Sequence, residues 1–568
     1  MVSRRPKFMS ALLKTAYVPT ELPPAITTKY VSEFCEKDYA FLRTNRKQLI
    51  KTTTNYDTFT APRTSGGRRN LAIVHPISQM GLSLLITEHR SRLRRIIDSN
   101  GISYYETKED MHNNRAFSGL NFKKWRLEKA KLCSESKFIL QADISRYFYT
   151  AYTHSFPWSV IGKEKVKNWI VHNKSKLNKH WSNDFDVVLQ SCQSRETFGI
   201  PVGPDTSRII AEILVSGVEA DKELGKILIS RPAIRLVDDY LVGFDSEEEA
   251  HKALGVLRSA LWRFNLQLND AKTKVLPSSL IFEDRWKLDF EAIGISSNDP
   301  KQQGKDIARL RDLTLGFCAE TGTSAPAHWA SNRLNSLINI RENFDLILEV
   351  LLRFARDFPS VIPYLSVFVI NNKYTCRSSY RKRLLTDWVR RTIQSELHKG
   401  HDLEVAWCLV IAGVLKIEIT EDQIDSFDDM PSSVVFSLFG MLRERKLLKF
   451  SLSKWRWRSH YNQSGVLSEN WLPIYEAVRR GWTEDKRLVA AVQSNDILNR
   501  MLKSDVTFLE DRVFDASTIN LRSRTFRRDR RTAVPQDETQ GITRARGGQV
   551  SNDELVLDVE QFVSSYGV

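Results

Sequence analysis

The fold is decided by Ile234-Arg235-Leu236-Val237-Asp238-Asp239-Tyr240-Leu241-Val242-Gly243-Phe244. Apolar residues that favour strands flank two adjacent acids, and this pattern predicts a strand, a tight acidic turn and a second strand. Burying two unpaired carboxylates carries a large desolvation cost, so Asp238 and Asp239 either face water or hold a cation. A solvated Asp-Asp turn is the simpler interpretation, and the choice depends on the segments that accompany the hairpin.

A third acid follows another apolar strand, Phe138 to Asp143, upstream of the hairpin. Two strands that each end in Asp can converge on one metal pair, because two ions about 3.5–4 Å apart hold the attacking and leaving oxygens of a phosphoryl transfer. We expect Asp143 and Asp238 to bridge two Mg²⁺ ions, with Mn²⁺ as an alternative. Ile144 belongs to the same ligand set, and Asp239 is a weaker ligand. The simpler role for Asp143 is a cap on the following helix.

Two further segments complete the pattern. Residues 198–207 form a Gly- and Pro-punctuated loop that opens an amphipathic helix, and its low side-chain bulk lets a nucleotide approach the backbone at Gly203. Downstream, Lys272 or Lys274 would offset triphosphate charge or donate a proton to a leaving pyrophosphate. An ordinary turn and surface lysines are the simpler interpretations.

The order of these segments, strand with Asp, Gly-Pro loop with helix, Asp-Asp hairpin, helix and Lys strand, resembles the palm of reverse transcriptases. In detail it is similar to bacterial antiphage-defence reverse transcriptases of the abortive-infection and "unknown group" class, over about residues 60–280. The phrases that carry the closer likeness are Ala142–Ser145, Tyr152–Ser155, Gly199–Ser207 and Ala211–Ile213. Two residues depart from the general family pattern, and they put processivity or template use in doubt: Leu236, where many members have Tyr, and Val202, where many have Gln.

The resemblance implies an α+β fold, a right-hand polymerase with fingers and palm, followed by an all-α thumb and a HEAT-like helical-repeat domain. It implies that Phe148 blocks a ribose 2′-hydroxyl and that Arg69, on a fingers strand, meets the incoming triphosphate. Arg126 resembles a second basic residue of the fingers, and His154 is a candidate to orient a template or primer phosphate. The alternatives are a core aromatic, surface arginines and a capping or core histidine.

We expect an N-terminal helical segment (1–60), fingers and palm (61–290), an α-helical thumb and repeat domain (291–515) and a basic flexible tail (516–568). The formal charge of +16 suits a polyanionic partner. Trp455 and Trp457 lie among basic residues, as in sites that hold single-stranded product. Arg90, Arg92, Arg94 and Arg95 on one helix either track a nucleic-acid backbone or form a solvated face. Scattered cysteines, and the lack of long apolar runs and of a signal peptide, favour a cytoplasmic location and no membrane partner.

The resulting hypothesis is an RNA-directed DNA polymerase of a bacterial antiviral defence system. Its partners would be dNTPs and an RNA template or DNA product, with a noncoding RNA, a second copy of the chain or a partner protein as further candidates. One alternative keeps the site but drops the template, with priming from a tyrosine hydroxyl of the protein. The sixteen tyrosines give no basis for choosing one. A non-catalytic nucleic-acid-binding α-repeat scaffold is the alternative of another class, and three clustered acids argue against it because they carry an electrostatic cost.

Overall fold

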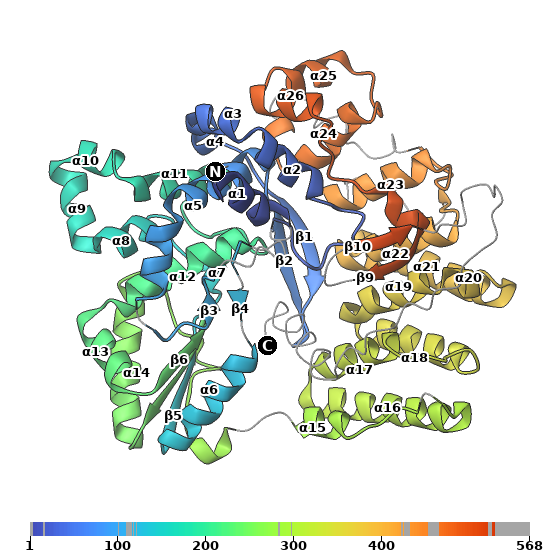
Figure 1. Cartoon of the computed structure of the whole chain (residues 1–568), viewed down its shortest axis with the longest axis horizontal. Coiled ribbons are helices and arrows are strands. Elements are labelled where there is room, and N and C mark those ends of the chain that lie inside the picture. Colours follow the sequence, from blue (N-terminus) through green and yellow to red (C-terminus); the bar gives the residue numbers. More distant parts are fainter. Residues whose placement is uncertain are drawn as a thin grey trace, which may run out of the picture.

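A computed structural model of the chain (Figure 1) describes residues 4–14, 17–99, 101–108, 116–117, 119–120, 122–281, 285–296, 298–421, 424, 432–451, 465–520 and 525–528. Among these residues, no helix is both long enough and apolar enough to cross a membrane. Trp455 and Trp457 lie outside the described residues, as does the part of the expected basic tail beyond residue 528.

The central sheet is antiparallel and has four strands in the order β6-β7-β5-β8. Its strands are β5 (Phe138–Asp143), β6 (Ala233–Leu236), β7 (Asp239–Phe244) and β8 (Lys274–Pro277). β6 and β7 form the hairpin expected from the sequence, and β5 pairs with β7 so that Asp143 stands opposite Asp239. The two strands that carry Asp143 and Asp239, β5 and β7, are therefore direct neighbours, and Asp238 lies in the turn before β7.

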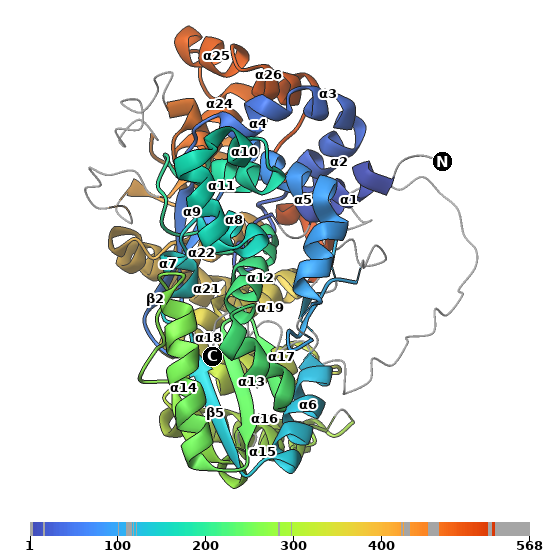
Figure 2. The ribbon, with the colours of Figure 1, turned by 90° about the vertical axis from the view of Figure 1, so that its left-hand side faces the viewer.

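Alternation along these strands sends successive side chains to two helix-covered faces. Ala142 and Tyr240 point into one core together with residues of α12 (Asp205–Glu219) and α14 (Glu247–Trp262). Ile139 and Leu241 point into a smaller core that is covered by α6 (Phe122–Glu135). Figure 2 shows β5 between α14 on one side and α6 on the other.

The remaining elements of the first half lie before β5 or between β5 and β6 in the sequence. They are α1 (Arg4–Lys14), α2 (Lys29–Lys37), α3 (Tyr39–Thr44), α4 (Arg46–Lys51), β1 (Asp57–Pro62), β2 (Arg68–Ile73), α5 (Pro76–Ile97), β3 (Tyr105–Glu106), β4 (Gly119–Leu120), α7 (Tyr147–Thr150), α8 (Ser155–Ile161), α9 (Lys163–His172), α10 (Lys174–Asn178), α11 (Trp181–Ser191) and α13 (Lys222–Ser230). β1 and β2 form an antiparallel hairpin whose connection turns at Gly66 and Gly67, both with positive φ (88° and 73°). Glycine accepts this backbone conformation without steric cost.

The second half consists mainly of helices that pack against one another in succession (Figure 1). They are α15 (Arg285–Glu291), α16 (Pro300–Thr321), α17 (Ala325–Asn335), α18 (Phe344–Asp357), α19 (Ile362–Asn371), α20 (Lys373–Cys376), α21 (Ser379–Glu396), α22 (Asp402–Leu415), α23 (Ser433–Glu444), α24 (Trp471–Arg479), α25 (Lys486–Gln493) and α26 (Asp496–Lys503). A two-stranded sheet of β9 (Ala516–Asn520) and β10 (Thr525–Arg528) follows, so the first residues of the expected flexible tail are strands.

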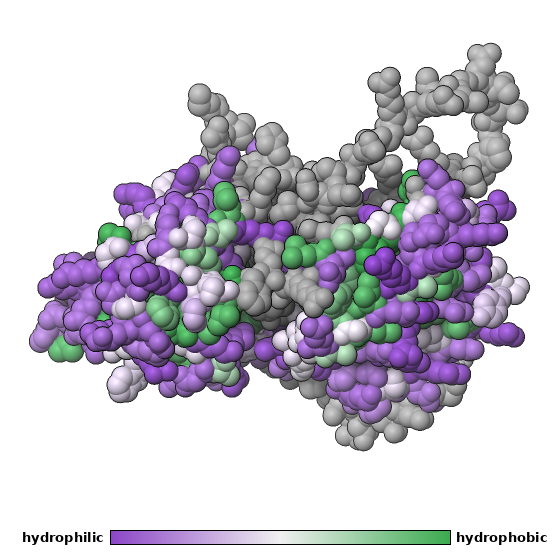
Figure 3. Space-filling model, turned by 90° about the horizontal axis from the view of Figure 1, so that it is seen from below, coloured by the Kyte–Doolittle hydropathy of each residue, from purple (hydrophilic) through white to green (hydrophobic). Residues whose placement is uncertain are grey.

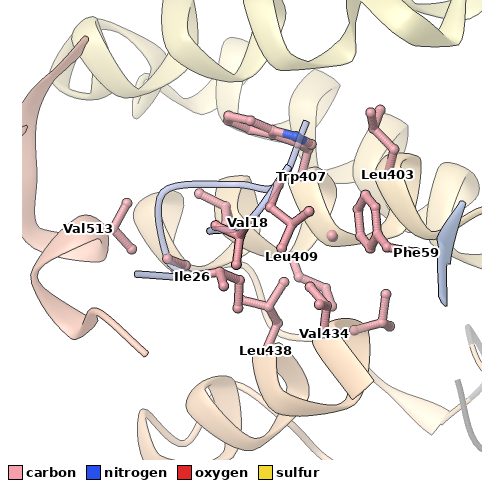
Figure 4. Close-up of a cluster of buried hydrophobic side chains, with 14 of the residues drawn as sticks. Val18, Ile26, Phe59, Leu403, Trp407, Leu409, Val434, Leu438 and Val513 are labelled. Carbon is pink, nitrogen blue, oxygen red and sulfur yellow. The ribbon is translucent and has the colours of Figure 1, made fainter. Parts of the chain in front are cut away.

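The hydrophobic cores group the chain differently from the expected domain boundaries. One core joins the N-terminal segment, the β1–β2 hairpin and the helical second half, as the cluster around Val18, Phe59, Trp407 and Leu438 shows (Figure 4). A second core belongs to the sheet and its helices. β2, which was expected to be a strand of the fingers, therefore packs together with β1 on the helical half.

The surface reflects this two-part organisation. Seen from below in Figure 3, the surface that faces the viewer is mostly hydrophilic on both sides of the molecule. Hydrophobic patches lie on the sides of the two parts that face each other (Figure 3).

Candidate active site

The acidic hairpin brings three aspartates to one end of the central sheet. Leu236 pairs with Asp239, so Val237 and Asp238 form a two-residue turn between β6 and β7. Asp143 pairs with Asp239, and strand partners that stand directly opposite each other project to the same face. The backbone N–H of Ile144 donates to the carbonyl of Asp238 over 3.3 Å. We call Asp143, Asp238 and Asp239 the aspartate cluster.

The turn is strained at Val237, whose φ of 60° lies in the left-handed region. A β-branched residue is a rare occupant of that region, and such outliers persist only where surrounding contacts hold them. Arg235 provides one of these contacts, because its Nη1 donates to the carbonyl of Val237 over 2.8 Å. Arg235 therefore helps to fix the turn that carries Asp238.

Arg235 belongs to a buried ionic network that the sequence did not reveal. Its Nε lies 2.5 Å from Glu219 Oε1 and its Nη1 3.0 Å from Glu212 Oε2, and all three side chains are almost completely buried. The Tyr240 hydroxyl also donates to Glu219 over 3.1 Å. Both glutamates come from α12, so the network locks this helix to the strands that carry the aspartates. A sequence signal did exist, namely two acids seven positions apart within the helix and a lone arginine in an apolar strand.

The aspartate cluster carries more negative charge than its surroundings neutralise. Burial, followed by the charge of Asp143, raises the pKa of Asp238 from 3.8 to about 6. Burial, followed by the charges of Asp238 and Asp143, raises the pKa of Asp239 well above its usual value. Lys272 is the basic side chain in contact, with Nζ 3.2 Å from Asp143 Oδ2. Crowded carboxylates of this kind are stabilised by a bound cation.

The donor set fits a hard divalent cation. The side chains offer only carboxylate oxygens, which Mg²⁺ prefers. Ile144, expected among the ligands, has a buried apolar side chain, so only its backbone carbonyl is chemically suited to the role. The three aspartates do not form a closed cage of ligand atoms. Within the described residues, the trio whose ligand atoms all lie within 4.8 Å of one another is a different one, formed by Glu396, His401 and Glu404.

That second trio, the glutamate–histidine cluster, is already neutralised by basic side chains. Arg68 binds Glu404 through two nitrogens, at 2.7 and 2.9 Å. Lys399 Nζ lies 2.9 Å from Glu396 Oε1, and His401 Nδ1 lies 2.6 Å from Glu396 Oε2. A carboxylate with a bidentate arginine has little left to offer a metal ion. We therefore regard this cluster as the ionic anchor of β2 on the helical half.

The residues expected near the nucleotide lie around the loop that precedes α12. Phe148 is half-buried, and its carbonyl accepts a 2.8 Å hydrogen bond from the N–H of Ile200 in that loop. Gly203 has a φ of +125°, and a Cβ there would stand 2.6 Å from Pro19 Cγ. Pro19 of the N-terminal segment therefore makes close contact where the sequence suggested a nucleotide would approach.

The expected basic residues of the fingers occupy β2 and α6. Arg69 pairs with Ala61 in the β1–β2 hairpin, and alternation directs its side chain to the face opposite that of Arg68. The Tyr149 hydroxyl ties β2 to α7 through the carbonyl of Asn70, over 3.0 Å. Arg126 is half-buried on α6, which packs against the sheet.

His154 lies just before α8 and is held by Asp186 of α11. Its Nδ1 is 2.5 Å from Asp186 Oδ2, and this hydrogen bond raises the pKa of His154. Asp186 accepts a second hydrogen bond, from Gln190 Nε2, over 2.7 Å. The imidazole therefore has a structural partner, and a phosphate would contact its other nitrogen.

Comparisons with known proteins give only loose likenesses. No family model matches the sequence, and no curated protein matches it. Among solved structures, apo telomerase from Candida tropicalis is similar at 11% identity and a TM-score of 0.29, over 64% of this chain and 66%, just under two thirds, of that one. Telomerases from C. tropicalis and C. albicans in complex with the TWJ fragment of telomeric RNA give 13% identity and TM-scores of 0.28 and 0.25. They cover 71% and 67% of this chain and 68% and 71% of those chains.

Proposed function

We propose that this chain is an RNA-directed DNA polymerase, a reverse transcriptase of a bacterial antiviral defence system, which joins deoxynucleotides by two-metal catalysis. The observation that carries the proposal is the register of β5 with β7. It sets Asp143 opposite Asp239, directly beside the turn that presents Asp238. The raised pKa values of Asp238 and Asp239 support a cation as the binding partner of these carboxylates. The defence role rests on sequence resemblance alone.

In this proposal Asp143, Asp238 and Asp239 hold the metal ions. When bound, two Mg²⁺ ions would supply electrostatic stabilisation of the attacking and leaving oxygens. The 3′-hydroxyl of the growing strand would attack the α-phosphorus of a dNTP and release its proton to water, a new P–O bond would form, and the bond to pyrophosphate would break. Lys272 is positioned beside Asp143 to give a proton to the departing pyrophosphate.

Phe148 would select the sugar by steric exclusion. Its backbone is hydrogen-bonded to the loop before α12, and its half-buried ring packs 5.6 Å from that of Tyr147. In this proposal the ring would block a ribose 2′-hydroxyl, whereas a deoxyribose carries no hydroxyl at that position. Arg69, Arg126 and His154 remain proposed contacts for phosphates of the nucleotide, template or primer.

A second candidate function is template-independent DNA synthesis, primed by a tyrosine of the chain or by another hydroxyl. The contact of Pro19 with Gly203 favours it, because the N-terminal segment lies against the loop that would otherwise approach a template base. The carbonyl of Val202, a position where many reverse transcriptases have Gln, accepts a hydrogen bond from the N–H of Ala72 over 2.8 Å.

One assay separates these functions. The full chain is incubated with Mg²⁺ and labelled dNTPs or rNTPs, with and without an RNA template and primer, alongside Asp238→Asn and the matched surface change Asp270→Asn. RNA-dependent dNTP incorporation that Asp238→Asn abolishes and Asp270→Asn retains supports the first function. RNA-independent incorporation supports the second. No incorporation under any condition, with Asp238→Asn indistinguishable from wild type, contradicts both and leaves a scaffold.

A further inference from the structure

A basic and aromatic face lies away from the aspartate cluster, on α5, α9, α10 and α11. In Figure 1 the helices α9 and α10 project at the left edge of the molecule, and Figure 2 shows them from the front. Between residues 163 and 180 the sequence has one acid, Glu164, against six lysines: Lys163, Lys165, Lys167, Lys174, Lys176 and Lys179. All of these lysines except the half-buried Lys163 are exposed.

Four aromatic rings form a ladder across this face. The ring centroids of Trp169 and His180 are 6.0 Å apart, those of His180 and Trp181 5.7 Å, and those of Trp181 and His89 4.7 Å. All four side chains are half-buried, so each ring is fixed by packing and still has an accessible edge or face. The ladder runs from α9 through α11 to α5, which means that three helices contribute to one continuous surface.

Cations stand over both ends of this ladder. Lys165 and Lys176 lie 5.5 and 4.8 Å from the centroid of Trp169, and Arg92 lies 5.5 Å from the centroid of Trp181. Two ammonium groups over a single indole repel each other. Burial and then the charges of Arg92 and Lys165 lower the pKa of His180. The cations at both ends of the ladder therefore influence the ring at its middle.

The chemistry of this surface favours nucleic acid over other occupants. Aromatic rings with an accessible face accept unpaired bases by stacking, and flanking lysines and arginines bind the phosphates between those bases. An acidic protein would account for the cations but not for the ladder. An anionic membrane would use the exposed Ile170 and Val171, which are 50% and 75% exposed, but the half-buried Trp169 beside them has its ring paired with two lysines.

We propose that the ladder face, formed by His89, Trp169, His180 and Trp181 with Lys165, Lys176 and Arg92, is a binding site for single-stranded nucleic acid outside the aspartate cluster. Phosphates bind the three cations, and bases stack on the rings between them. The site goes beyond the proposed function, because it needs neither metal ions nor a competent aspartate cluster. It would hold the template, the product or another strand on the outer side of the molecule.

The test is binding of labelled oligo(U) and oligo(dT) to the full chain by fluorescence anisotropy, at several salt concentrations. The variant Lys165→Glu/Lys176→Glu is compared with Lys486→Glu/Lys503→Glu, which makes the same charge change at exposed lysines of α25 and α26. The ladder variant should lose about tenfold in affinity at about 50 mM salt, and the slope of log K against log salt should fall by about 1.4. Arg92→Glu, at the other end of the ladder, should also lower the affinity for the oligonucleotides. The melting temperature of each variant is measured as a control, and a value close to that of wild type shows that the variant is folded.

Equal losses in the ladder and control variants, or no loss in either, would overturn the proposal. So would a ladder variant that keeps nucleic-acid binding but no longer binds vesicles containing anionic lipid. A loss with oligo(U) alone or oligo(dT) alone identifies the strand, and either result supports the site. Asp238→Asn should bind as wild type does, so failure of the proposed polymerase activity and failure of this binding site are observed separately.

Discussion

The aspartate cluster and the glutamate–histidine cluster are two acidic groups built in opposite ways. In the glutamate–histidine cluster, burial opposes the ionised form of Glu396, but hydrogen bonds from Lys399 and His401 lower its pKa below the usual value. In the aspartate cluster, burial and neighbouring carboxylates raise the pKa values of Asp238 and Asp239, and Lys272 only partly offsets them. The comparison indicates that ion pairs neutralise the glutamate–histidine cluster, whereas the aspartate cluster keeps uncompensated charge, which supports our proposal that it holds a cation.

The largest expected effect is the opposite response of the two clusters to neutralising substitutions. Asp238→Asn should reduce nucleotide incorporation at least about a thousandfold, because a metal ligand is lost. The same change should raise the melting temperature by removing uncompensated charge. Glu404→Gln should instead cost about 3 kcal/mol of stability, because it removes the charge partner of Arg68. Activity assays and thermal unfolding of both variants check this, and a lower melting temperature for Asp238→Asn would contradict it.

The next largest effect concerns Arg235, which supports the strained turn from beneath. Arg235→Met should destabilise the protein by about 3–5 kcal/mol, since two buried glutamates lose their partner. The triple variant Arg235→Met/Glu212→Gln/Glu219→Gln removes the unpaired charge and should recover most of that stability. Its activity should remain about tenfold or more below wild type, because the hydrogen bond to the Val237 carbonyl is still missing. Full recovery of activity in the triple variant would limit the network to a structural role.

A smaller effect is the pH dependence that Asp238 brings to stability. Its pKa is about 6 in the folded chain against 3.8 ordinarily. The folded state therefore binds the proton more tightly, and stability falls as the pH rises from about 4 through about 6. The difference in melting temperature between Asp238→Asn and wild type should grow over this range and level off above it. The same window should move to lower pH when Mg²⁺ is added, because the cation favours the ionised carboxylate.

The smallest expected effect is on sugar selection. Phe148→Ala should increase incorporation of rNTPs relative to dNTPs by about tenfold or more, since the ring no longer excludes the 2′-hydroxyl. The matched control is Phe198→Ala, which removes an exposed ring on the neighbouring loop. Competition between labelled dNTPs and rNTPs measures the ratio. An unchanged ratio in Phe148→Ala would assign this residue to packing.

The parts of the structure that local pattern dictates could be predicted from the sequence. The hairpin around Asp238 follows from apolar residues flanking a two-residue turn. The mainly helical second half follows from its periodicity. These features depend on residues that are close in the sequence, so one amino-acid sequence is sufficient to indicate them.

Contacts between distant segments could not be predicted. Arg68 and Glu404 are 336 residues apart, so their ion pair had no local signal in the sequence. The same is true of Pro19 against Gly203, which involves the N-terminal segment and the loop before α12. The core that the N-terminal segment shares with the helical half also joins residues far apart in the sequence, so it had no local signal.

The most direct test of the central claim is where the chain binds a divalent cation. Mn²⁺ binding to the full chain, measured by electron paramagnetic resonance, is compared for wild type, Asp143→Asn and Glu404→Gln. The account predicts that wild type and Glu404→Gln bind Mn²⁺ alike and that Asp143→Asn binds it at least about tenfold more weakly. Binding that survives Asp143→Asn but is lost in Glu404→Gln would assign the cation to the glutamate–histidine cluster and contradict the account.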